Sequence, residues 1–461
     1  MHKQQVDALV IGFGKGGKTL AGFMAQKGWE VAVIEKSKQM YGGTCINIAC
    51  IPSKSLSHSA EQAARRHFAT FLEKQDVYQN AVEDKEQLVT FLRGANYAKL
   101  NQNPHVSVID GMATFLSPNE VRVDLDGSDQ MIIEAKHIFI NTGTLPHLPP
   151  IAGLTESEHV YTSTSMMNLS QLPEELVIIG SGHIGLEFAA MYAAFGSHVT
   201  VLHRGNLFLP DHDRDIADAV KTTIEKQGIQ FHLQANVLQI ADRDERASIT
   251  YVDQTQTRRT LTADAVLIAT GRVPNTQSLD LAQAGVEVDE YGFIKVDEFL
   301  RTTAPNIWAL GDINGGPQFT YISLDDFRII RDQLFGDGQR SQLSRRNVPS
   351  SLFIYPTLSW AGLSETEARH QGYEVKVATL PAGAIPRTRQ VAHTDGLLKA
   401  IVDAKTKRIL GCFLFSEDSS EVINLVSIAM NAGLDYRVLR DNIFTHPSMS
   451  EGLNDLFTQI S

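Results

Sequence analysis

Cysteine is scarce in this chain, with only three among 461 residues. Three cysteines are too few for the disulfide framework of a secreted protein, and in a reducing compartment a close pair is more often catalytic or metal-binding than structural. No apolar run approaches the roughly 18 residues that a membrane span requires. The sequence enters VDALVIGFG directly, without the regions of a signal peptide. We therefore expect a cytoplasmic protein that does not bind membranes.

Positively charged residues are fewer than negatively charged ones. Lys and Arg number 41 against 53 Asp and Glu, which gives a formal net charge of −12. Nucleic acids and anionic membranes require a clustered excess of Lys and Arg, so neither is an expected partner, and small molecules or metal ions are favoured. The length and the 43% content of hydrophobic residues predict a large enzyme with two or three domains.

A strand–turn–helix–strand pattern opens the chain. The apolar run from Ala8 to Ile11 leads into a G-x-G-x-x-G turn and a helical pattern, and the next strand is EVAVIE. The residues expected to bind a dinucleotide here are Gly12, Gly14, Gly17, Glu35 and Lys36. The glycines let the backbone approach a pyrophosphate at the helix N-terminus, and the glutamate can accept ribose hydroxyls. The pattern predicts a dinucleotide site, with an ordinary tight turn as the alternative.

The same pattern recurs later in the chain. A strand from Glu175 to Ile179, a glycine-rich turn, the helical LEFAAMYAAFG and the strand HVTVL occur in succession. The candidate residues of this second site are Gly180, Gly182, Ile184, Gly185, His203 and Arg204. Neutral or cationic residues at the second strand end suit a 2′-phosphate and favour NADPH, although Arg204 could also be solvated surface.

Three short segments are typical of loops that close a nucleotide site. They are FINTGTLPHLPP, LIATGRVPN and NIWALGDING, in each of which a strand is followed by a turn. Their candidate cofactor-binding residues are Thr142, Gly143, Gly271, Arg272, Gly311 and Asp312. The aspartate can hold sugar or ribityl hydroxyls. Each segment alone could also be a surface turn.

The stretch GGTCINIACIPSK, residues 42–54, contains Cys45 and Cys50. In a regular helix, residues five apart are separated by about 7.5 Å along the axis, more than the roughly 7 Å between Cα atoms that a disulfide tolerates. A bond therefore needs a distorted segment, and we expect the preceding glycines and an interruption of hydrogen bonding at Pro52 to provide it. A thiolate at a helix start or beside Lys54 has a lowered pKa. The pattern predicts a redox-active pair. A zinc site is not predicted, because the sequence offers no second Cys or His pair at ligand spacing.

The motifs together resemble a known family. The cysteine stretch, both glycine-rich turns, ATGRVPN, ALGD and the C-terminal FTHPSMSE are similar to those of the pyridine nucleotide-disulfide oxidoreductases, flavoproteins that include glutathione reductase and mercuric reductase. The resemblance covers essentially the whole chain. It implies an α/β fold with two Rossmann-like domains and a C-terminal α+β dimerisation domain. FAD would bind residues 1–150 and 272–340, NAD(P)H residues 151–271, and residues 348–461 would form a homodimer.

The resemblance assigns roles to the cysteine segment. Gly43 and Thr44 belong to the FAD site by their place in the motif. Hydride passes from the nicotinamide to the flavin, which reduces the disulfide. Cys50 matches the thiolate that lies against the flavin, and Cys45 matches the thiol that attacks the outside substrate.

Four further residues match catalytic positions of the family. Lys54 and Glu187 match a pair beside the flavin N5. His446 and Glu451 match a general base and the carboxylate that fixes its tautomer, and His446 is implied to reach the disulfide of the other subunit. Cys412, within an apolar strand, is expected to be a buried small hydrophobe.

Departures from the family pattern reduce the number of activities that the resemblance allows. The chain ends in NDLFTQIS, without the vicinal cysteines of mercuric reductases, while QFTYISLDD, LPAGAIPR and IFTHPSMSEGLNDLF resemble a bacterial branch linked to reactive chlorine resistance and copper(II) reduction. We expect Cys45 and Cys50 to pass electrons to a soft metal ion, with copper(II) as substrate, in defence against oxidative stress.

Alternatives stay open. The same relay would serve a reductase of lipoamide or of a small disulfide, and a flavin-bearing redox sensor is a second alternative, although a sensor needs no second dinucleotide site. Gly185 is more usual in relatives that use NADH, so NADH and NADPH both remain candidates. His58 is either an additional metal ligand or a histidine on a helix surface.

Overall fold

The computed structural model describes residues 2–66, 68–125 and 129–460. The chain divides into two compact units, each built from three segments. The first unit consists of Met1–Leu56, Asn80–His147 and Gly271–Ser344, and the second of Ser57–Gln79, Leu148–Thr270 and Arg345–Ser461. In the described part of the chain, none of the helices combines the length and apolar character needed to cross a membrane.

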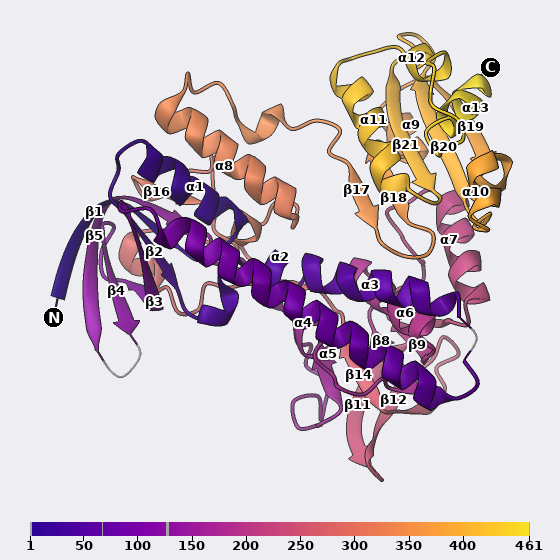
Figure 1. The fold of residues 1–461 in the computed structure, drawn as a ribbon, viewed down its shortest axis with the longest axis horizontal. Helices are drawn as coiled ribbons and strands as arrows, with labels where there is room; N and C mark the ends of the chain where they lie inside the picture. Colours follow the sequence, from indigo (N-terminus) through magenta and orange to yellow (C-terminus); the bar gives the residue numbers. More distant parts are fainter. Residues whose placement is uncertain (1, 67, 126–128, 461) are drawn as a thin grey trace. The chain divides into compact units, whose positions relative to one another are not determined.

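The first unit contains a six-stranded sheet (Figure 1). Its strands are β1 (His2–Ile11), β2 (Val31–Glu35), β3 (Val106–Phe115), β4 (Glu120–Leu125), β5 (Gln130–Ile140) and β16 (Ile307–Ala309). The parallel order is β3–β2–β1–β5–β16, and β4 pairs antiparallel with β3 and β5. The register places Ile140 beside both Ile11 and Ala309. The carboxyl ends of these parallel strands therefore share one edge, where ligands bind in such sheets.

Both faces of this sheet are covered. Ala8 and Val10 of β1 belong to one hydrophobic core, and Leu9 and Ile11 belong to another. Central parallel strands buried on both faces read as unbroken apolar runs, as Ala8–Ile11 does. The strand begins earlier than expected because its polar start, from His2 onward, pairs with β5.

Helices and short elements complete the first unit. They are α1 (Lys15–Gln26), α2 (Thr44–Asn47), α8 (Thr320–Phe335), β6 (Thr144–Pro146), β15 (Arg272–Pro274), and the 3-10 helices η1 (Lys38–Met40), η2 (Leu281–Ala284), η3 (Asp312–Asn314) and η4 (Gln342–Ser344). Two helices contribute residues to both units, α3 (Cys50–Ala64) and α4 (Phe71–Asn101). α1 packs against α8, and its buried stripe includes Leu20, Ala21 and Met24.

The second unit repeats the strand–turn–helix–strand pattern in a parallel sheet of order β10–β9–β8–β14–β7. Its elements are β7 (Val160–Thr162), α5 (Ser163–Met166), β8 (Glu175–Ile179), α6 (His183–Phe195), β9 (His198–His203), α7 (Arg214–Lys226), β10 (Gln230–Leu233) and β14 (Ala265–Ile268). A separate antiparallel sheet has the order β11 (Asn236–Arg243), β12 (Arg246–Val252) and β13 (Arg258–Ala263). Strand β8 has the bounds predicted from the sequence.

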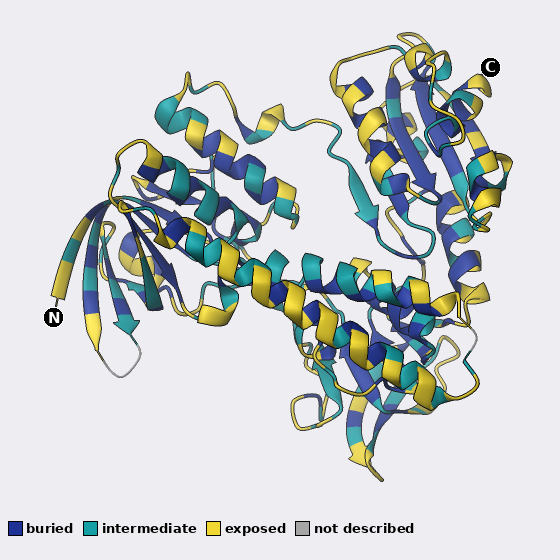
Figure 2. Ribbon diagram, viewed as in Figure 1, coloured by how far each residue is buried: buried dark blue, intermediate teal, exposed yellow. Residues whose placement is uncertain are grey.

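The C-terminal part of the second unit is an antiparallel sheet covered by helices. Its strands, in spatial order, are β17 (Ser350–Leu352), β18 (Leu358–Gly362), β21 (Ile409–Phe415), β20 (Leu397–Asp403) and β19 (Val375–Pro381). Its helices are α9 (Glu365–His370), η5 (Ala382–Ala384), α10 (Pro386–Gln390), α11 (Ser419–Asn431), α12 (Arg437–Arg440) and α13 (Gly452–Thr458). Figure 2 shows β20 and β21 buried along most of their length. Cys412 in β21 is fully buried, which confirms its expected place in the core.

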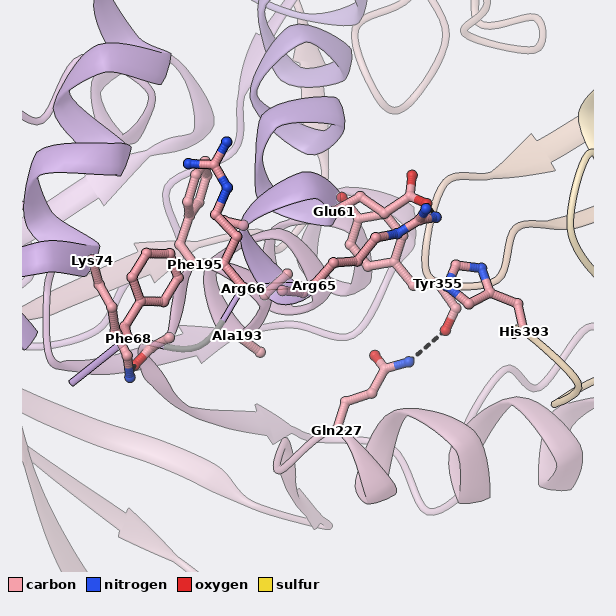
Figure 3. Close-up of a pocket in the computed structure, with 14 residues that line it drawn as sticks. Glu61, Arg65, Arg66, Phe68, Lys74, Ala193, Phe195, Gln227, Tyr355 and His393 are labelled. Carbon is pink, nitrogen blue, oxygen red and sulfur yellow. Dashed lines mark hydrogen bonds and ion pairs between the residues drawn. The ribbon is translucent and has the colours of Figure 1, made fainter. Parts of the chain in front are cut away.

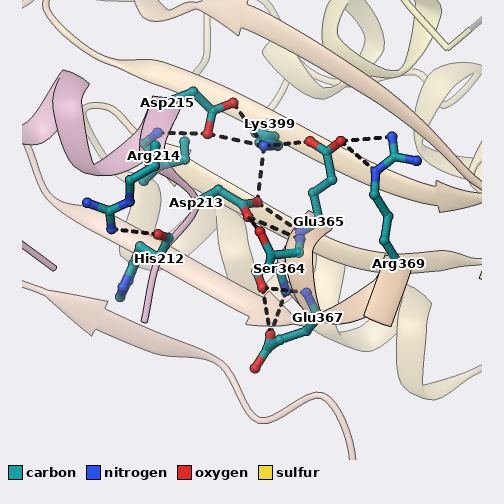
Figure 4. Close-up of polar contacts among 11 residues, drawn as sticks. His212, Asp213, Arg214, Asp215, Ser364, Glu365, Glu367, Arg369 and Lys399 are labelled. Carbon is teal, nitrogen blue, oxygen red and sulfur yellow. Dashed lines mark hydrogen bonds and ion pairs between the residues drawn. The ribbon is translucent and has the colours of Figure 1, made fainter. Parts of the chain in front are cut away.

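A buried lysine links three segments of the second unit (Figure 4). The ammonium group of Lys399, on β20, lies within 3.0 Å of carboxylates from Asp213, Asp215 and Glu365, and its side chain is 3% exposed. Burial alone would lower the pKa of Lys399, but its hydrogen bonds with these carboxylates raise it. Asp213 also accepts hydrogen bonds from the backbone N–H groups of Glu365 and Thr366, at 2.8 and 3.2 Å. The cluster therefore ties the starts of α7 and α9 to the C-terminal sheet.

Candidate functional site

The first glycine-rich turn fits a phosphate group. Gly12 has a φ of 102°, and a Cβ atom there would lie 2.4 Å from the carbonyl oxygen of Asn141, so only glycine fits. Helix α1 begins after Gly14, whose position as N-cap leaves the helix without a side-chain cap. Free N–H groups at a helix start attract anions. This local geometry supports the predicted dinucleotide site.

Glu35 is buried at the end of β2 and holds this turn together. Its Oε2 atom accepts a hydrogen bond from the N–H of Phe13 at 3.0 Å, and Oε1 accepts one from Ser37 at 3.2 Å. Burial raises the pKa of Glu35, against the opposing effect of these bonds. Each carboxylate oxygen has a second lone pair that can accept a ribose hydroxyl. Lys36, the next residue, is exposed.

Asn141 is a residue at this site that sequence reasoning missed. It comes directly after β5, its Oδ1 accepts from the N–H of Gly17 at 3.0 Å, and its Nδ2 donates to the carbonyl of Leu310 at 2.6 Å. The fully buried Asp326 likewise accepts from the N–H of Gly311 at 2.6 Å. These side chains fix the turns that surround the strand ends. An asparagine directly after an apolar strand was the available signal.

The closing segments bring polar groups to the same edge of the sheet. The guanidinium of Arg272 donates to the hydroxyl and the carbonyl of Thr144, both at 2.7 Å, and that hydroxyl donates to Asp312 at 3.3 Å. Burial raises the pKa of Asp312, which Arg272 counteracts. The hydroxyl of Thr142 is buried and has no hydrogen-bond partner among the described residues. A buried hydroxyl without a partner is costly, and a bound cofactor with polar groups would satisfy it.

Three of the predicted glycines in these segments adopt the left-handed region. Gly143, Gly271 and Gly311 have φ values of 67°, 111° and 76°. At Gly311 a Cβ atom would lie 2.9 Å from the side chain of Asn141. These glycines therefore shape the turns after the strands, as the sequence predicted.

The two cysteines lie on either side of a break between helices α2 and α3. Cys45 belongs to α2, Cys50 begins α3, and Ile48 between them has a φ of −140° and a ψ of 11°. The expected distortion is confirmed. The expectation that Pro52 interrupts hydrogen bonding after the pair is wrong, because this residue lies in the first turn of α3, where proline is tolerated.

The cysteine segment packs directly on the first glycine-rich turn. Gly43 has a φ of 79°, and a Cβ atom there would lie 2.6 Å from the Cα atom of Gly14. Thr44 is the next residue and the first of α2. Any dinucleotide held by the turn would therefore lie next to the cysteine segment.

The cysteine thiols are polarised against each other. Both are free, and the S–H of Cys45 donates to the sulfur of Cys50, which lowers the pKa of Cys50 despite its burial. The hydroxyl of Thr320 lies 3.4 Å from the Cys50 sulfur and, with the charge of Lys54, lowers this pKa further. The same thiol–thiol hydrogen bond, together with burial, raises the pKa of Cys45. The hydrogen bond therefore favours the thiolate form of Cys50 and the thiol form of Cys45.

Lys18, on helix α1, is a second residue that was missed. Its ammonium group donates to the carbonyl of Gly42 at 3.2 Å and to Asn96 at 2.5 Å. Burial lowers the pKa of Lys18 to about 8, and its charge acts on Cys45. A lysine within the first turns of a glycine-rich helix was the only signal in the sequence.

The second glycine-rich turn, between β8 and α6, has the same local geometry. Gly180 has a φ of 110°, and a Cβ atom there would lie 2.3 Å from the carbonyl of Ala269. At Gly185 a Cβ atom would lie 2.1 Å from the carbonyl of Gly180, whereas the space at Gly182, the uncapped N-cap of α6, is open. Ile184, in the first turn of α6, is half-buried.

The strand end of the second site differs from that of the first. His203 ends β9, and burial lowers its pKa. Arg204 comes next and is exposed.

Glu187, on α6, accepts a hydrogen bond from the N–H of Phe353 at 3.1 Å. The pairing of Glu187 with Lys54 stays a prediction.

The predicted base and its carboxylate meet in the C-terminal part of the second unit. Nδ1 of His446 lies 2.7 Å from Oε2 of Glu451, and the other carboxylate oxygen accepts from the N–H of Ser448 at 3.2 Å. The His446 side chain is 68% exposed and that of Glu451 is 17% exposed. A held carboxylate fixes the tautomer of the ring and leaves Nε2 for proton transfer.

His58 is exposed on α3 and hydrogen-bonds Gln62 at 2.8 Å, as the helix-surface alternative expected.

Comparison with known proteins identifies the class. The family model described as pyridine nucleotide-disulphide oxidoreductase matches residues 6–326, and the dimerisation domain of the same family matches residues 348–457. The chain belongs to the pyridine nucleotide-disulphide oxidoreductase family, and the expected fold class and enzyme class are confirmed.

Individual relatives match 98% or more of this chain. The probable pyridine nucleotide-disulfide oxidoreductase RclA of Escherichia coli (strain K12) is 49% identical over 460 residues, with 100% of each chain covered. The mercuric reductase of Lysinibacillus sphaericus is 33% identical over 98% of this chain and 82% of its own. The solved structure of the HOCl-induced flavoprotein disulfide reductase RclA from Escherichia coli matches with a TM-score of 0.92 and 49% identity over 99% of this chain and 100% of that one. Its Cu(II) complex matches with a TM-score of 0.93, 48% identity and the same coverage.

Proposed function

We propose that this chain is an FAD-dependent NAD(P)H oxidoreductase that passes electrons through Cys45 and Cys50 to a soft metal ion, reducing copper(II) to copper(I) in defence against reactive chlorine and oxidative stress. The observation that carries the proposal is the cysteine pair at the helix break, in which one thiol has a lowered pKa. The Cu(II) complexes of the similar Escherichia coli protein support copper as the metal.

The residues of the first unit fit FAD. The uncapped start of α1, the carboxylates of Glu35 and Asp312, and the unpartnered hydroxyl of Thr142 offer groups for phosphates and hydroxyls. When bound, FAD supplies the redox group through which two electrons from NAD(P)H reach the cysteines. We assign FAD to residues 1–150 and 272–340, and NADPH or NADH to residues 151–271.

The reduced cysteine pair holds two electrons, and each copper(II) ion accepts one. Formation of one disulfide bond between Cys45 and Cys50 therefore accompanies reduction of two copper(II) ions and releases the thiol proton. The complete reaction converts NAD(P)H and two copper(II) ions into NAD(P)⁺, two copper(I) ions and one proton. Thiolates are soft ligands that favour copper(I), and Cys45, the cysteine assigned to the outside substrate, would bind the metal once a base has removed its proton.

His446 and Glu451 supply the proton acceptor in this proposal. Cys45 has a raised pKa and needs a base to become a thiolate. Both residues of the pair lie within residues 348–457, the dimerisation domain of the family. We infer a homodimer in which His446 of one protomer acts on the cysteine pair of its partner.

The test is anaerobic oxidation of NADPH and of NADH with copper(II), lipoamide and oxidised glutathione as separate acceptors, with copper(I) captured by a chromogenic chelator. We expect copper-dependent turnover that falls to background in Cys45→Ser and in Cys50→Ser. The matched control is Cys412→Ala, which removes the buried third thiol and leaves the reactive pair intact.

Three outcomes contradict the proposal. Faster turnover with a disulfide substrate would make the protein a disulfide reductase. Copper reduction that persists in Cys45→Ser would assign the chemistry to another group. Absence of turnover with every acceptor would favour a redox sensor.

A further inference from the structure

One histidine and two carboxylates meet in the second unit, away from both glycine-rich turns in sequence. They are His393, Glu61 and Glu417, and one ligand atom of each lies within 4.8 Å of those of the other two. No other group of this kind occurs among residues 2–66, 68–125 and 129–460. The three side chains are half-buried, so water and small ions reach them.

Separate elements hold the three side chains in place. Glu61 lies on α3, in its last turns. His393 lies just beyond α10, and its backbone N–H donates to the carbonyl of Thr388 at 2.9 Å. Thr388 is itself buried and donates its hydroxyl to the carbonyl of Ile385 at 2.8 Å. Glu417 lies two residues past the end of β21. One donor therefore lies on a helix, and the other two lie in turns that closely follow a helix and a strand.

The histidine is already oriented by one of the carboxylates. Nδ1 of His393 lies 2.7 Å from Oε2 of Glu417, and the two side chains are 30% and 24% exposed. This contact is a hydrogen bond between the ring nitrogen and the carboxylate oxygen. A cation can bind Nδ1 in its place, since the neutral imidazole can carry its hydrogen on the other ring nitrogen. Two carboxylates and a neutral imidazole together supply the charge of −2 that a divalent cation balances.

A cavity of about 440 Å³ borders the cluster (Figure 3). Glu61, His393, Tyr355 and Gln227 are among its lining residues. The amide of Gln227 donates to the backbone carbonyl of Tyr355 at 2.5 Å, and the Tyr355 hydroxyl donates to the carbonyl of Ser57. The wall is therefore fixed, and the open space gives room for water molecules as additional ligands.

We propose that His393, Glu61 and Glu417 bind a divalent transition-metal ion, with water from the cavity completing its coordination. One imidazole nitrogen with two carboxylate oxygens is a donor set that zinc accepts, with three protein ligands and an open position. Calcium and magnesium prefer oxygen ligands throughout. Without a thiolate the site also has no preference for copper(I), so it is chemically distinct from the cysteine pair.

The site would link two parts of the second unit through the ion. Glu61 belongs to the helix that begins at Cys50, whereas His393 and Glu417 belong to the region of the dimerisation domain. Arg65 pairs with Glu61 at 2.7 Å in the absence of the ion and competes with it. Binding therefore exchanges one exposed ion pair for a metal link between these segments.

The test is a calorimetric titration of Zn²⁺ into the flavin-loaded Cys45→Ser, Cys50→Ser double variant, which removes the reactive thiolates. We expect one zinc ion per chain and a higher melting temperature with zinc. Glu417→Gln and His393→Gln are each expected to weaken binding about tenfold or more, since each removes a ligand. Arg65→Gln is expected to tighten binding by about threefold, because it removes an exposed competitor.

The matched controls are Glu421→Gln and His370→Gln, which replace an exposed glutamate and an exposed histidine elsewhere in the same unit. They are expected to leave the zinc affinity unchanged. Absence of zinc binding in the double variant would overturn the proposal, as would an affinity unaffected by His393→Gln. If Glu417→Gln fails to fold, the titrations of His393→Gln and Arg65→Gln still test the proposal. It requires weaker zinc binding in the first variant and tighter zinc binding in the second.

Discussion

The chain contains the strand–turn–helix–strand pattern twice, and the two copies differ in the segment that comes after their second strand. After β2 comes the segment of Cys45 and Cys50, and after β9 comes the segment of Asp213 and Asp215, which binds Lys399. The first segment contains Cys50, a half-buried thiol with a lowered pKa, and the second contains Asp213, a buried carboxylate that pairs with Lys399. Lys399 is surrounded by three carboxylates, whereas the Cys50 thiolate is stabilised by a thiol, a hydroxyl and the charge of Lys54.

This difference teaches how one scaffold supports two roles. A buried charge that is matched by full opposite charges is held in a single ionisation state, and removing one partner is costly because the other charge is left buried without compensation. A buried thiolate that is stabilised mainly by hydrogen-bond donors remains a nucleophile and an electron donor. The segment after β2 therefore carries a group suited to electron transfer, and the segment after β9 carries a charge cluster that connects parts of the fold.

The largest expected effects come from replacing the first glycine of each glycine-rich turn, and they differ between the two turns. In Gly12→Ala, the new methyl group would lie 2.4 Å from a backbone oxygen, and we expect purified protein that has lost most of its flavin. In Gly180→Ala, where the distance is 2.3 Å, we expect flavin to be retained while the KM for NADPH rises about tenfold or more, since overpacking costs about 1–3 kcal/mol. Flavin absorbance and steady-state kinetics measure both.

The controls for this pair are Gly28→Ala and Gly228→Ala. Both glycines have a positive φ, at 83° and 88°, but no heavy atom lies within 4 Å of the added Cβ position. They carry the same backbone strain without the clash. Equal loss in variant and control would show that strain, not the close approach, explains the requirement for glycine.

The next effect concerns the charge cluster after β9. Lys399→Met leaves Asp213 buried without its cation, and we expect a loss of about 3–5 kcal/mol in the free energy of unfolding. Lys405→Met is the control, because that lysine is 76% exposed and lies 4.0 Å from Glu374; we expect it to change stability by less than about 1 kcal/mol. Denaturant unfolding measures both. A small effect of Lys399→Met would mean that Asp213 is not left as an uncompensated buried charge when the lysine is removed.

The third effect concerns the thiolate after β2. Cys45→Ala removes the S–H donor, so we expect the pKa of Cys50 in the reduced protein to rise by about one unit, or about 1.4 kcal/mol. Cys45→Ser keeps a donor and is expected to leave this pKa low. Because the native pKa is lowered, the thiolate persists as the pH falls through neutrality and is lost earlier in Cys45→Ala. The ultraviolet absorbance of the thiolate, with Cys50→Ser as blank, measures the titration. Equal values for the two variants would contradict the assigned donor.

The smallest effect lies at the second strand end. Arg204 is exposed, so its attraction for a 2′-phosphate is worth about 1 kcal/mol or less. We expect Arg204→Ala to raise the KM for NADPH by about fivefold with little change for NADH. An equal change for both cofactors, or none, would remove the reason for assigning NADPH to this site. The exposed Arg243→Ala serves as the control for a general change in surface charge.

Much of the fold was predictable because its signals are local. The apolar run Glu175–Ile179 coincides with β8, and both glycine-rich turns and the distortion between the cysteines were expected from the residue types alone. The start of β1 was not, since His2 and the polar residues after it form a strand only through pairing with β5. Pro52 was misjudged because the first turn of a helix accepts a proline that its interior would reject.

The supporting contacts of the candidate site were not predictable. The N–H of Gly16 donates to Ser323, 307 residues away, and Asn141 connects α1 with the end of β16. Such contacts depend on the register of distant strands, for which one sequence gives no pattern. The same holds for Lys399, which in sequence is one lysine within an apolar strand and in the structure is the centre of an ion-pair cluster.

The contrast between Glu35 and Arg204 has an evolutionary consequence. Glu35 is 7% exposed and accepts two backbone hydrogen bonds, so its replacement damages the turn as well as any ligand contact. Arg204 is exposed at a strand end, where most side chains fit without disturbing a core. Under the proposed cofactor assignment, a single substitution at Arg204 could change the preferred electron donor without disturbing the fold, whereas a change at Glu35 would also disturb the folding of the first turn.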